Sequence, residues 1–159
     1  MLRSVIGLII FCSLSSSAQA ENVEIYFETP STNIFCVYRD NHGNEQANID
    51  CVIGQFTPSF DSNFARKTFD PITGNDETLC TPDKLERFIV RQGSSEAIAF
   101  CPSLDILGDP ITDEQVFTLQ YGQVFSRGGL TCQSTKKGLS CTNESGHGFF
   151  LSKARQSIF

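Results

Sequence analysis

The sequence lacks most of the short motifs that identify an enzyme or a metal protein. It contains no C-x-x-C pair, which argues against a structural zinc site, and no glycine-rich loop that would cradle a phosphate. A G-x-S-x-G nucleophile elbow and an EF-hand calcium loop are also missing. We therefore expect no metal, no cofactor and no enzyme activity.

Tryptophan is absent as well. The charged fraction, 19% of the 159 residues, is near the average, and 40% of the residues are hydrophobic. This balance argues against an intrinsically disordered chain, and the length suits one domain with its own hydrophobic core. The formal net charge of −6 argues against nucleic acid as a partner.

The most apolar run of the chain lies at its N-terminus. Residues Val5 to Leu14 follow the cationic Arg3 and precede Ala18-Gln19-Ala20. This order is typical of a secretory signal peptide. Ten residues are too few to span a bilayer, which needs about 20. We expect residues 1–20 to be a signal peptide and residues 21–159 to be a single domain that spans no membrane.

Signal cleavage changes the cysteine count. It removes Cys12 and leaves six cysteines, an even number that indicates three disulfides in an oxidising compartment. An antiparallel alignment of the segments around Cys36 and Cys51 makes these two residues direct partners, at a Cα separation of about 4.5–5.5 Å that suits a disulfide. The resulting pairs are all apolar: Ile34 with Ile53, Cys36 with Cys51, and Tyr38 with Ile49.

The other four cysteines follow the same scheme. Pairing Cys132 with Cys141 leaves a loop from Thr135 to Gly138, in which the last position suits a left-handed glycine. Cys80 then remains to pair with Cys101. The sequence thus predicts three bridges in sequential order.

Short strand patterns alternate with turn residues along the rest of the chain, which predicts an all-β fold, a small antiparallel sandwich or barrel built from short hairpins. The segment from Thr81 to Phe100 suits either a helix or a hairpin. The closing turn, Lys153 to Ser157, could be helical. The expected strands are Glu24 to Glu28, Val116 to Tyr121, Gly129 to Ser134, Leu139 to Thr142, and Phe149 to Ser152.

The C-terminal third carries the most distinctive motifs. They are Tyr121-Gly122, the C-x8-C hairpin of Cys132 and Cys141, Gly146-His147-Gly148-Phe149 with Leu151-Ser152, and the terminal Phe159. In this order they resemble a bacterial family of secreted domains of unknown function. The stretch Thr29 to Cys36 resembles the family's opening T-P-S-G-N-I-x-C, with Thr32 in place of glycine, whereas the family's D-W-G is missing. The resemblance implies an exported bacterial β domain, periplasmic or secreted. It also favours the hairpin between Thr81 and Phe100, and it supplies no activity.

Charge is unevenly distributed along the mature chain. Residues 21–124 contain 6 basic and 17 acidic side chains, whereas residues 125–159 contain 5 basic side chains and only Glu144 as an acid. A basic C-terminal third favours an anionic partner, although a solvated face would have the same composition. His147, between two glycines, can approach a ligand or simply hold a tight turn. The ligand-binding candidates are Tyr121, Gly146, His147, Gly148, Lys153 and Arg155.

We interpret the chain as a monomeric, non-enzymatic binding or interaction module for a protein or envelope ligand. One alternative is an envelope hydrolase that uses His147 with loop carboxylates, and another is a purely structural domain. A third is an inhibitor of an envelope-targeting enzyme, because exported lysozyme inhibitors resemble this chain in size and construction. The loop carboxylates are Asp105, Asp109, Asp113 and Glu114.

Overall fold

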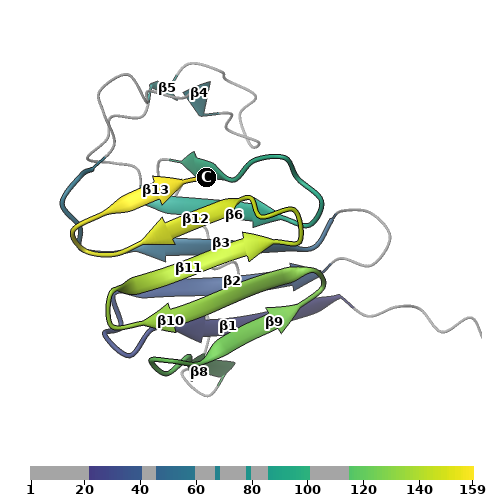
Figure 1. The fold of residues 1–159 in the computed structure, drawn as a ribbon, viewed down its shortest axis with the longest axis horizontal. Coiled ribbons are helices and arrows are strands. Elements are labelled where there is room, and N and C mark those ends of the chain that lie inside the picture. Colours follow the sequence, from purple (N-terminus) through teal and green to yellow (C-terminus); the bar gives the residue numbers. More distant parts are fainter. Residues whose placement is uncertain (1–21, 41–45, 60–66, 69–77, 80–85, 101–114) are drawn as a thin grey trace, which may run out of the picture.

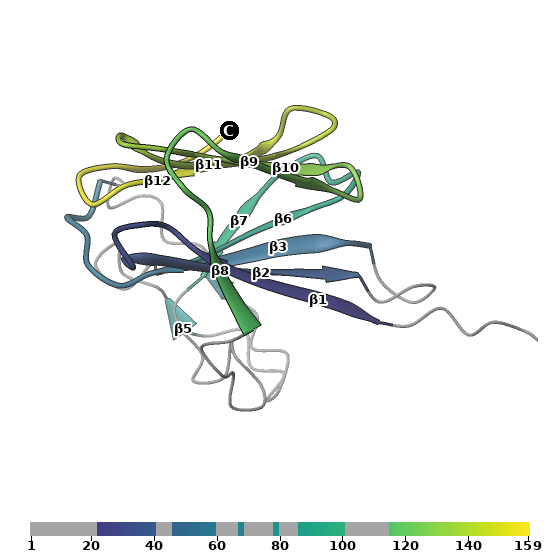
Figure 2. The ribbon, with the colours of Figure 1, turned by 90° about the horizontal axis from the view of Figure 1, so that it is seen from below.

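Two β-sheets lie face to face in the computed structural model (Figures 1 and 2). The structure describes residues 22–40, 46–59, 67–68, 78–79, 86–100 and 115–159. These residues contain strands and no α-helix. The expected all-β sandwich is therefore confirmed.

Six strands form the larger sheet. In chain order they are β1 (Val23–Glu28), β2 (Ile34–Asp40), β3 (Asn48–Ile53), β6 (Arg87–Arg91), β7 (Ile98–Phe100) and β8 (Val116–Thr118). Their spatial order is β7-β6-β3-β2-β1-β8. A separate two-stranded sheet consists of β4 (Lys67–Thr68) and β5 (Thr78–Leu79).

The larger sheet is mixed, so the expectation of a purely antiparallel fold is wrong at one edge. Strand β8 runs parallel to β1, with Phe27 beside Phe117. The expected strand from Val116 to Tyr121 is also shorter than predicted. It ends at Thr118 because the chain leaves this sheet there and crosses to the other one (Figure 2).

Five strands form the smaller sheet. They are β9 (Val124–Arg127), β10 (Leu130–Thr135), β11 (Gly138–Asn143), β12 (Gly148–Leu151) and β13 (Gln156–Ile158). Each strand pairs antiparallel with the next along the chain, which gives the order β13-β12-β11-β10-β9.

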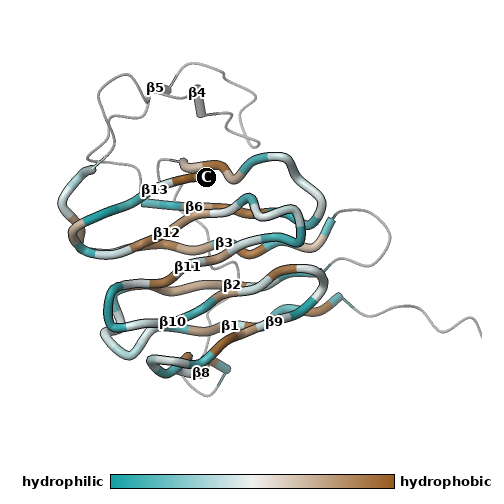
Figure 3. The backbone as a smooth tube through the Cα atoms, viewed as in Figure 1, coloured by the Kyte–Doolittle hydropathy of each residue, from teal (hydrophilic) through white to brown (hydrophobic). Residues whose placement is uncertain are grey.

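The core lies between the two sheets and follows the two-residue period of the strands. Along β11, for example, Leu139 and Cys141 are buried, while Ser140 and Thr142 lie on the opposite face. The same alternation of apolar and polar residues runs through the neighbouring strands (Figure 3). The largest fully buried side chains come from both sheets: Phe27, Tyr38, Ile49, Ile53, Phe88, Leu130, Leu139, Phe149 and Leu151.

Both cysteine hairpins have the expected register. Cys36 is opposite and bonded to Cys51, with Ile34 opposite Ile53, and Cys132 is opposite and bonded to Cys141. All four sulfur-bearing side chains are fully buried. The third expected bridge, Cys80–Cys101, lies outside the described residues.

The hairpin alternative is confirmed between Glu86 and Phe100, where β6 pairs antiparallel with β7. The expected helical turn from Lys153 to Ser157 is wrong. Ser152 and Arg155 exchange two backbone hydrogen bonds of 2.8 and 3.3 Å, which reverse the chain and start β13. The chain forms a hairpin turn instead of a helix because these bonds reverse its direction, so that β13 pairs antiparallel with β12.

Strand β9 is absent from the sequence-based expectations. It is short, and Val124 and Ser126 face solvent, so apolar alternation gives no signal. The signal that could have identified it is the dipeptide Gly128-Gly129, with φ of 55° and 73°. Two consecutive left-handed residues are what a two-residue hairpin turn requires.

Candidate functional site

An open groove of about 570 Å³ lies at one end of the sandwich. Its lining comes from the β1–β2 turn, the residues after β3, the link before β9, and the β10–β11 and β12–β13 turns. Three lysines contribute to it: Lys136, Lys137 and Lys153. We call this site the lysine groove.

The uncharged wall of the lysine groove is held by Asn33. Its side-chain amide donates to the Gln55 carbonyl at 2.9 Å, and its Oδ1 accepts from the Gln55 backbone N–H at 2.8 Å. The Asn33 carbonyl also accepts a hydrogen bond from the Gly54 N–H at 2.9 Å. These three bonds fix the β1–β2 turn against the end of β3.

Thr32, next to Asn33, has an unusual backbone conformation. Its φ is 53°, the only positive value for a non-glycine among the described residues. A β-branched residue is strained there because its Cβ crowds the backbone. The turn compensates with hydrogen bonds from Thr32 N to the Thr29 carbonyl and from Thr32 Oγ1 to the Ser31 carbonyl, both 2.8 Å long. This conformation explains why glycine suits the position that Thr32 occupies.

Lys136 and Lys137, on the cationic wall of the lysine groove, are held by the tight β10–β11 turn. Lys136 and Lys137 form the tip of the β10–β11 hairpin, where Thr135 Oγ1 donates to the Gly138 carbonyl at 3.0 Å. A Cβ on Gly138 would lie 2.3 Å from the Leu151 carbonyl oxygen, so only glycine permits this approach of β11 to β12. The lysine side chains are exposed.

Groups that remain available in the lysine groove are mainly hydrogen-bond donors. The hydroxyls of Thr135 and Ser152 already donate to carbonyls of their own turns. Within the described part of the chain, the three lysine ammonium groups and the phenol of Tyr121 have no hydrogen-bond partner. Tyr121 is 43% exposed. The lining includes no carboxylate among the described residues. Such a site favours an acceptor-rich anion over a cation.

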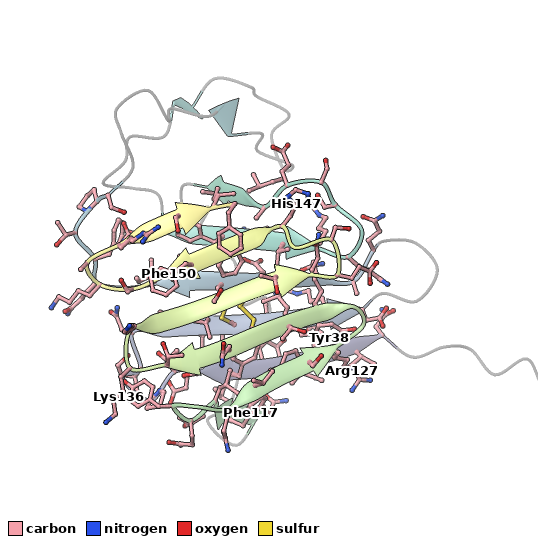
Figure 4. All side chains as sticks on the ribbon, in the orientation of Figure 1. Tyr38, Phe117, Arg127, Lys136, His147 and Phe150 are labelled. Atoms are coloured by element: carbon pink, nitrogen blue, oxygen red, sulfur yellow. A yellow bond between two sulfur atoms is a disulfide. The ribbon has the colours of Figure 1, made fainter. Side chains whose placement is uncertain are left out.

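The turn that carries His147 lies at the opposite end of the smaller sheet, as Figure 4 shows for His147 and Lys136. Strand β11 separates the two ends by roughly 16 Å at 3.3 Å per residue. In the described part of the chain, the His147 imidazole forms no hydrogen bond to a carboxylate. The carboxylate loop expected to assist it, Asp105 to Glu114, lies outside the described residues.

Asn143 holds the His147 turn. Its buried side chain accepts from the backbone N–H groups of Ser145 and His147 at 3.0 and 3.1 Å. The same side chain donates to the carbonyls of Arg91, at the end of β6, and of Ser94, in the β6–β7 connection, at 3.1 and 2.7 Å. Asn143 therefore ties the two sheets together. Its amide nitrogen is not accessible for N-glycosylation, although Asn143-Glu144-Ser145 matches the sequon.

The structure divides the candidate ligand-binding residues into two groups. Tyr121 and Lys153 line the lysine groove, and Arg155 lies in the same turn as Lys153, with its guanidinium 6.0 Å from the centre of the Phe150 ring. Gly146, His147 and Gly148 lie at the other end. Lys136 and Lys137 belong to the basic C-terminal third that the sequence favours as a contact for an anionic partner, together with Arg127, Lys153 and Arg155, but they were not among the ligand-binding candidates. Consecutive lysines at a hairpin tip were a usable signal for them.

Tyr38 and Arg127 form a second polar cluster, away from the lysine groove (Figure 4). The Arg127 guanidinium lies 5.8 Å from the centre of the Tyr38 ring, and the Tyr38 hydroxyl donates to Asp40 at 3.3 Å. Burial, and then the charge of Asp40, raise the pKa of Tyr38 above 10.0, while Arg127 partly opposes this.

The described residues contain no group of three or more histidines, cysteines and acids that could hold a metal ion. They also contain no helix with the length and hydropathy to cross a bilayer.

Comparison with known proteins gives one match. A family model described as a family of unknown function, DUF6636, matches residues 74–159, which is more than half of the chain. No curated protein and no solved structure matches.

Proposed function

This chain belongs to DUF6636, a family of unknown function, and we propose that it is an exported, non-enzymatic binding domain that takes an anionic ligand into the lysine groove. One observation carries the proposal: three lysines and a tyrosine hydroxyl are available in a groove whose described lining has no carboxylate. The signal-like N-terminus and the two buried disulfides agree with work outside the cytoplasm.

The lysines define the ligand chemistry. An ammonium group is a compact point charge with three rotatable donors, so it suits carboxylate, phosphate or sulfate groups without demanding one planar geometry. The exposed ring of Tyr121 adds a flat apolar surface with a polar tip. We therefore propose an envelope ligand that repeats anionic groups, such as an acidic polysaccharide.

The expected affinity is moderate and depends on salt. An exposed ion pair contributes about 0.2–1 kcal/mol, so three lysines together supply about 1–3 kcal/mol. The Debye length is about 8 Å at physiological ionic strength, so added salt weakens these contacts.

Isothermal titration of the mature protein tests the proposal, with tetragalacturonate as a carboxylate probe and tripolyphosphate as a phosphate probe. The variant Lys136→Gln/Lys137→Gln should weaken binding about 5- to 30-fold, which corresponds to about 1–2 kcal/mol. The matched control is Arg91→Gln/Arg127→Gln, which removes the same charge outside the groove. Equal weakening by both variants, or no binding to either probe at low salt, would contradict the proposal.

A further inference from the structure

Strand β9 is an open edge of the smaller sheet. The Cα atoms of Cys132 and Cys141 are 4.1 Å apart, which identifies a pair without mutual backbone hydrogen bonds. The backbone groups of Cys132 therefore point toward β9, where Phe125 is its partner. The same alternation appears two residues further along β10 and two residues before Phe125, where Ser134 N donates to the Gln123 carbonyl at 3.1 Å.

Because backbone groups alternate in direction along a strand, every second residue of β9 points its N–H and C=O groups away from the sheet. The N–H and C=O groups of Phe125 bond β10, so those of Val124 and Ser126 point to the free side. In the described part of the chain, no strand pairs with β9 on that side. The edge thus presents two donors and two acceptors in the pattern of an unpaired strand.

The opposite edge of the same sheet is covered. At β13, Ser59 Oγ accepts from the Gln156 N–H at 2.7 Å and donates to the Gln156 carbonyl at 2.9 Å. The Thr57 N–H donates to the Lys153 carbonyl at 2.7 Å nearby. The fold therefore protects one edge of this sheet with its own chain, and no comparable cover of β9 exists in the described residues.

Apolar side chains accompany the open edge. Phe117, on the neighbouring edge strand β8, is 40% exposed, and Val124 on β9 is 54% exposed. The Phe117 ring packs against Phe27 and Phe125, with ring centres 5.6 and 6.3 Å apart. Figure 4 shows Phe117 below β9, at the side of the sandwich where both sheets end. These two side chains add apolar area beside the unpaired backbone of β9.

We propose that β9 pairs with β9 of a second copy of this chain, antiparallel about a two-fold axis at Phe125. Val124 then pairs with Ser126 of the partner subunit, and Ser126 with the partner's Val124, so all outward backbone groups of both residues are bonded. Phe125 faces the partner's Phe125 without backbone bonds. Arg127 lies opposite the partner's Gln123, so no like charges meet. The result is a continuous ten-stranded sheet.

A second copy suits this edge because its free groups are self-complementary, as a two-fold interface requires. The length of the edge limits the affinity of the proposed dimer. Four residues span about 13 Å, and with Phe117 and Val124 the buried area stays below the roughly 1,200 Å² of stable interfaces. The dimer should therefore be weak, with the monomer expected from sequence prevailing in dilute solution.

Sedimentation velocity of the mature protein from about 1 μM to about 1 mM tests this inference. We expect the weight-average mass to rise toward the dimer across this range. Ser126→Pro should weaken association at least about tenfold, because it removes an outward donor without breaking the β9–β10 ladder. The matched control, Ser126→Ala, keeps the N–H and should dimerise within about threefold of the wild type.

Val124→Lys is the second variant, because a lysine on an edge strand opposes pairing while the monomer folds normally. It should also reduce dimerisation at least about tenfold, and it carries the test if Ser126→Pro does not fold. Amide spectra of each variant establish that the fold is intact. A wild-type protein that stays monomeric up to about 1 mM would overturn the proposal. So would variants that dimerise as the wild type does, since association would then use another surface.

Discussion

Replacing Asp50 with asparagine should destabilise the domain by about 3 kcal/mol. Asp50 lies in β3, a central strand of the larger sheet, on the face opposite to Cys51, and only 1% of its side chain is exposed. Arg39 donates to it at 3.2 Å from β2, and Arg87 donates at 2.9 Å from β6. One buried carboxylate therefore balances two guanidinium groups across three strands.

Asparagine keeps the shape of this side chain but removes its charge. Arg39 and Arg87, each about one-fifth exposed, would then face each other without a buried counter-charge. Removal of one partner of a buried ion pair typically costs about 3–5 kcal/mol. We expect the lower end because Arg39 retains Glu24, whose Oε1 lies 3.1 Å away.

Urea unfolding followed by circular dichroism measures this cost directly. A loss of about 3 kcal/mol corresponds to a decrease in Tm of about 10 °C for a domain of this size. The control is Glu24→Gln, which removes the exposed acid that pairs with the same arginine and should cost less than about 1 kcal/mol. If Asp50→Asn lies within about 1 kcal/mol of the wild type, the two guanidinium groups do not depend on this carboxylate and the reasoning fails.

Two further predictions concern stability. Thr32→Gly should stabilise the domain by about 0.5–1 kcal/mol in the same assay, because relief of left-handed strain exceeds the entropy cost of glycine, whereas Thr32→Ala should bring no such gain. A loss of stability with glycine would show that Thr32 is not strained. The raised pKa of Tyr38 means that the folded state holds its proton more tightly, so its contribution is complete below pH 10 and is lost as the pH rises through the folded-state pKa. Tyr38→Phe should reduce this alkaline loss, and equal losses in wild type and variant would contradict the assigned cause.

The register of both cysteine hairpins was predictable because two constraints require the same alignment: the apolar residues must share the buried face, and the two cysteines must lie opposite each other. A one-residue slip would move Ile34 and Ile53 to the opposite face and would separate Cys36 from Cys51. Strands β9 and β13 have no such constraint. Val124 and Ser126 face solvent, and the brevity of β13 leaves no periodic pattern to recognise.

The lysine groove could not be assembled from sequence for a different reason. Thr32, Gln55, Tyr121, Lys136 and Lys153 lie in separate connections and meet only because both sheets end there. A local pattern favoured His147 because it lies between two glycines, yet strand β11 holds it far from the lysines. Local sequence identified the basic third of the chain, and topology determined which of its charges come together.

The central claim is that the lysine groove binds an anionic ligand, and an amide chemical-shift titration of residues 21–159 with tetragalacturonate tests it most directly. We predict saturable shifts at Thr32, Gly54, Tyr121 and Lys137 that are lost in Lys136→Gln/Lys137→Gln and retained in Arg91→Gln/Arg127→Gln. Shifts centred on the His147 turn, or shifts spread without saturation over all basic residues, would contradict the claim.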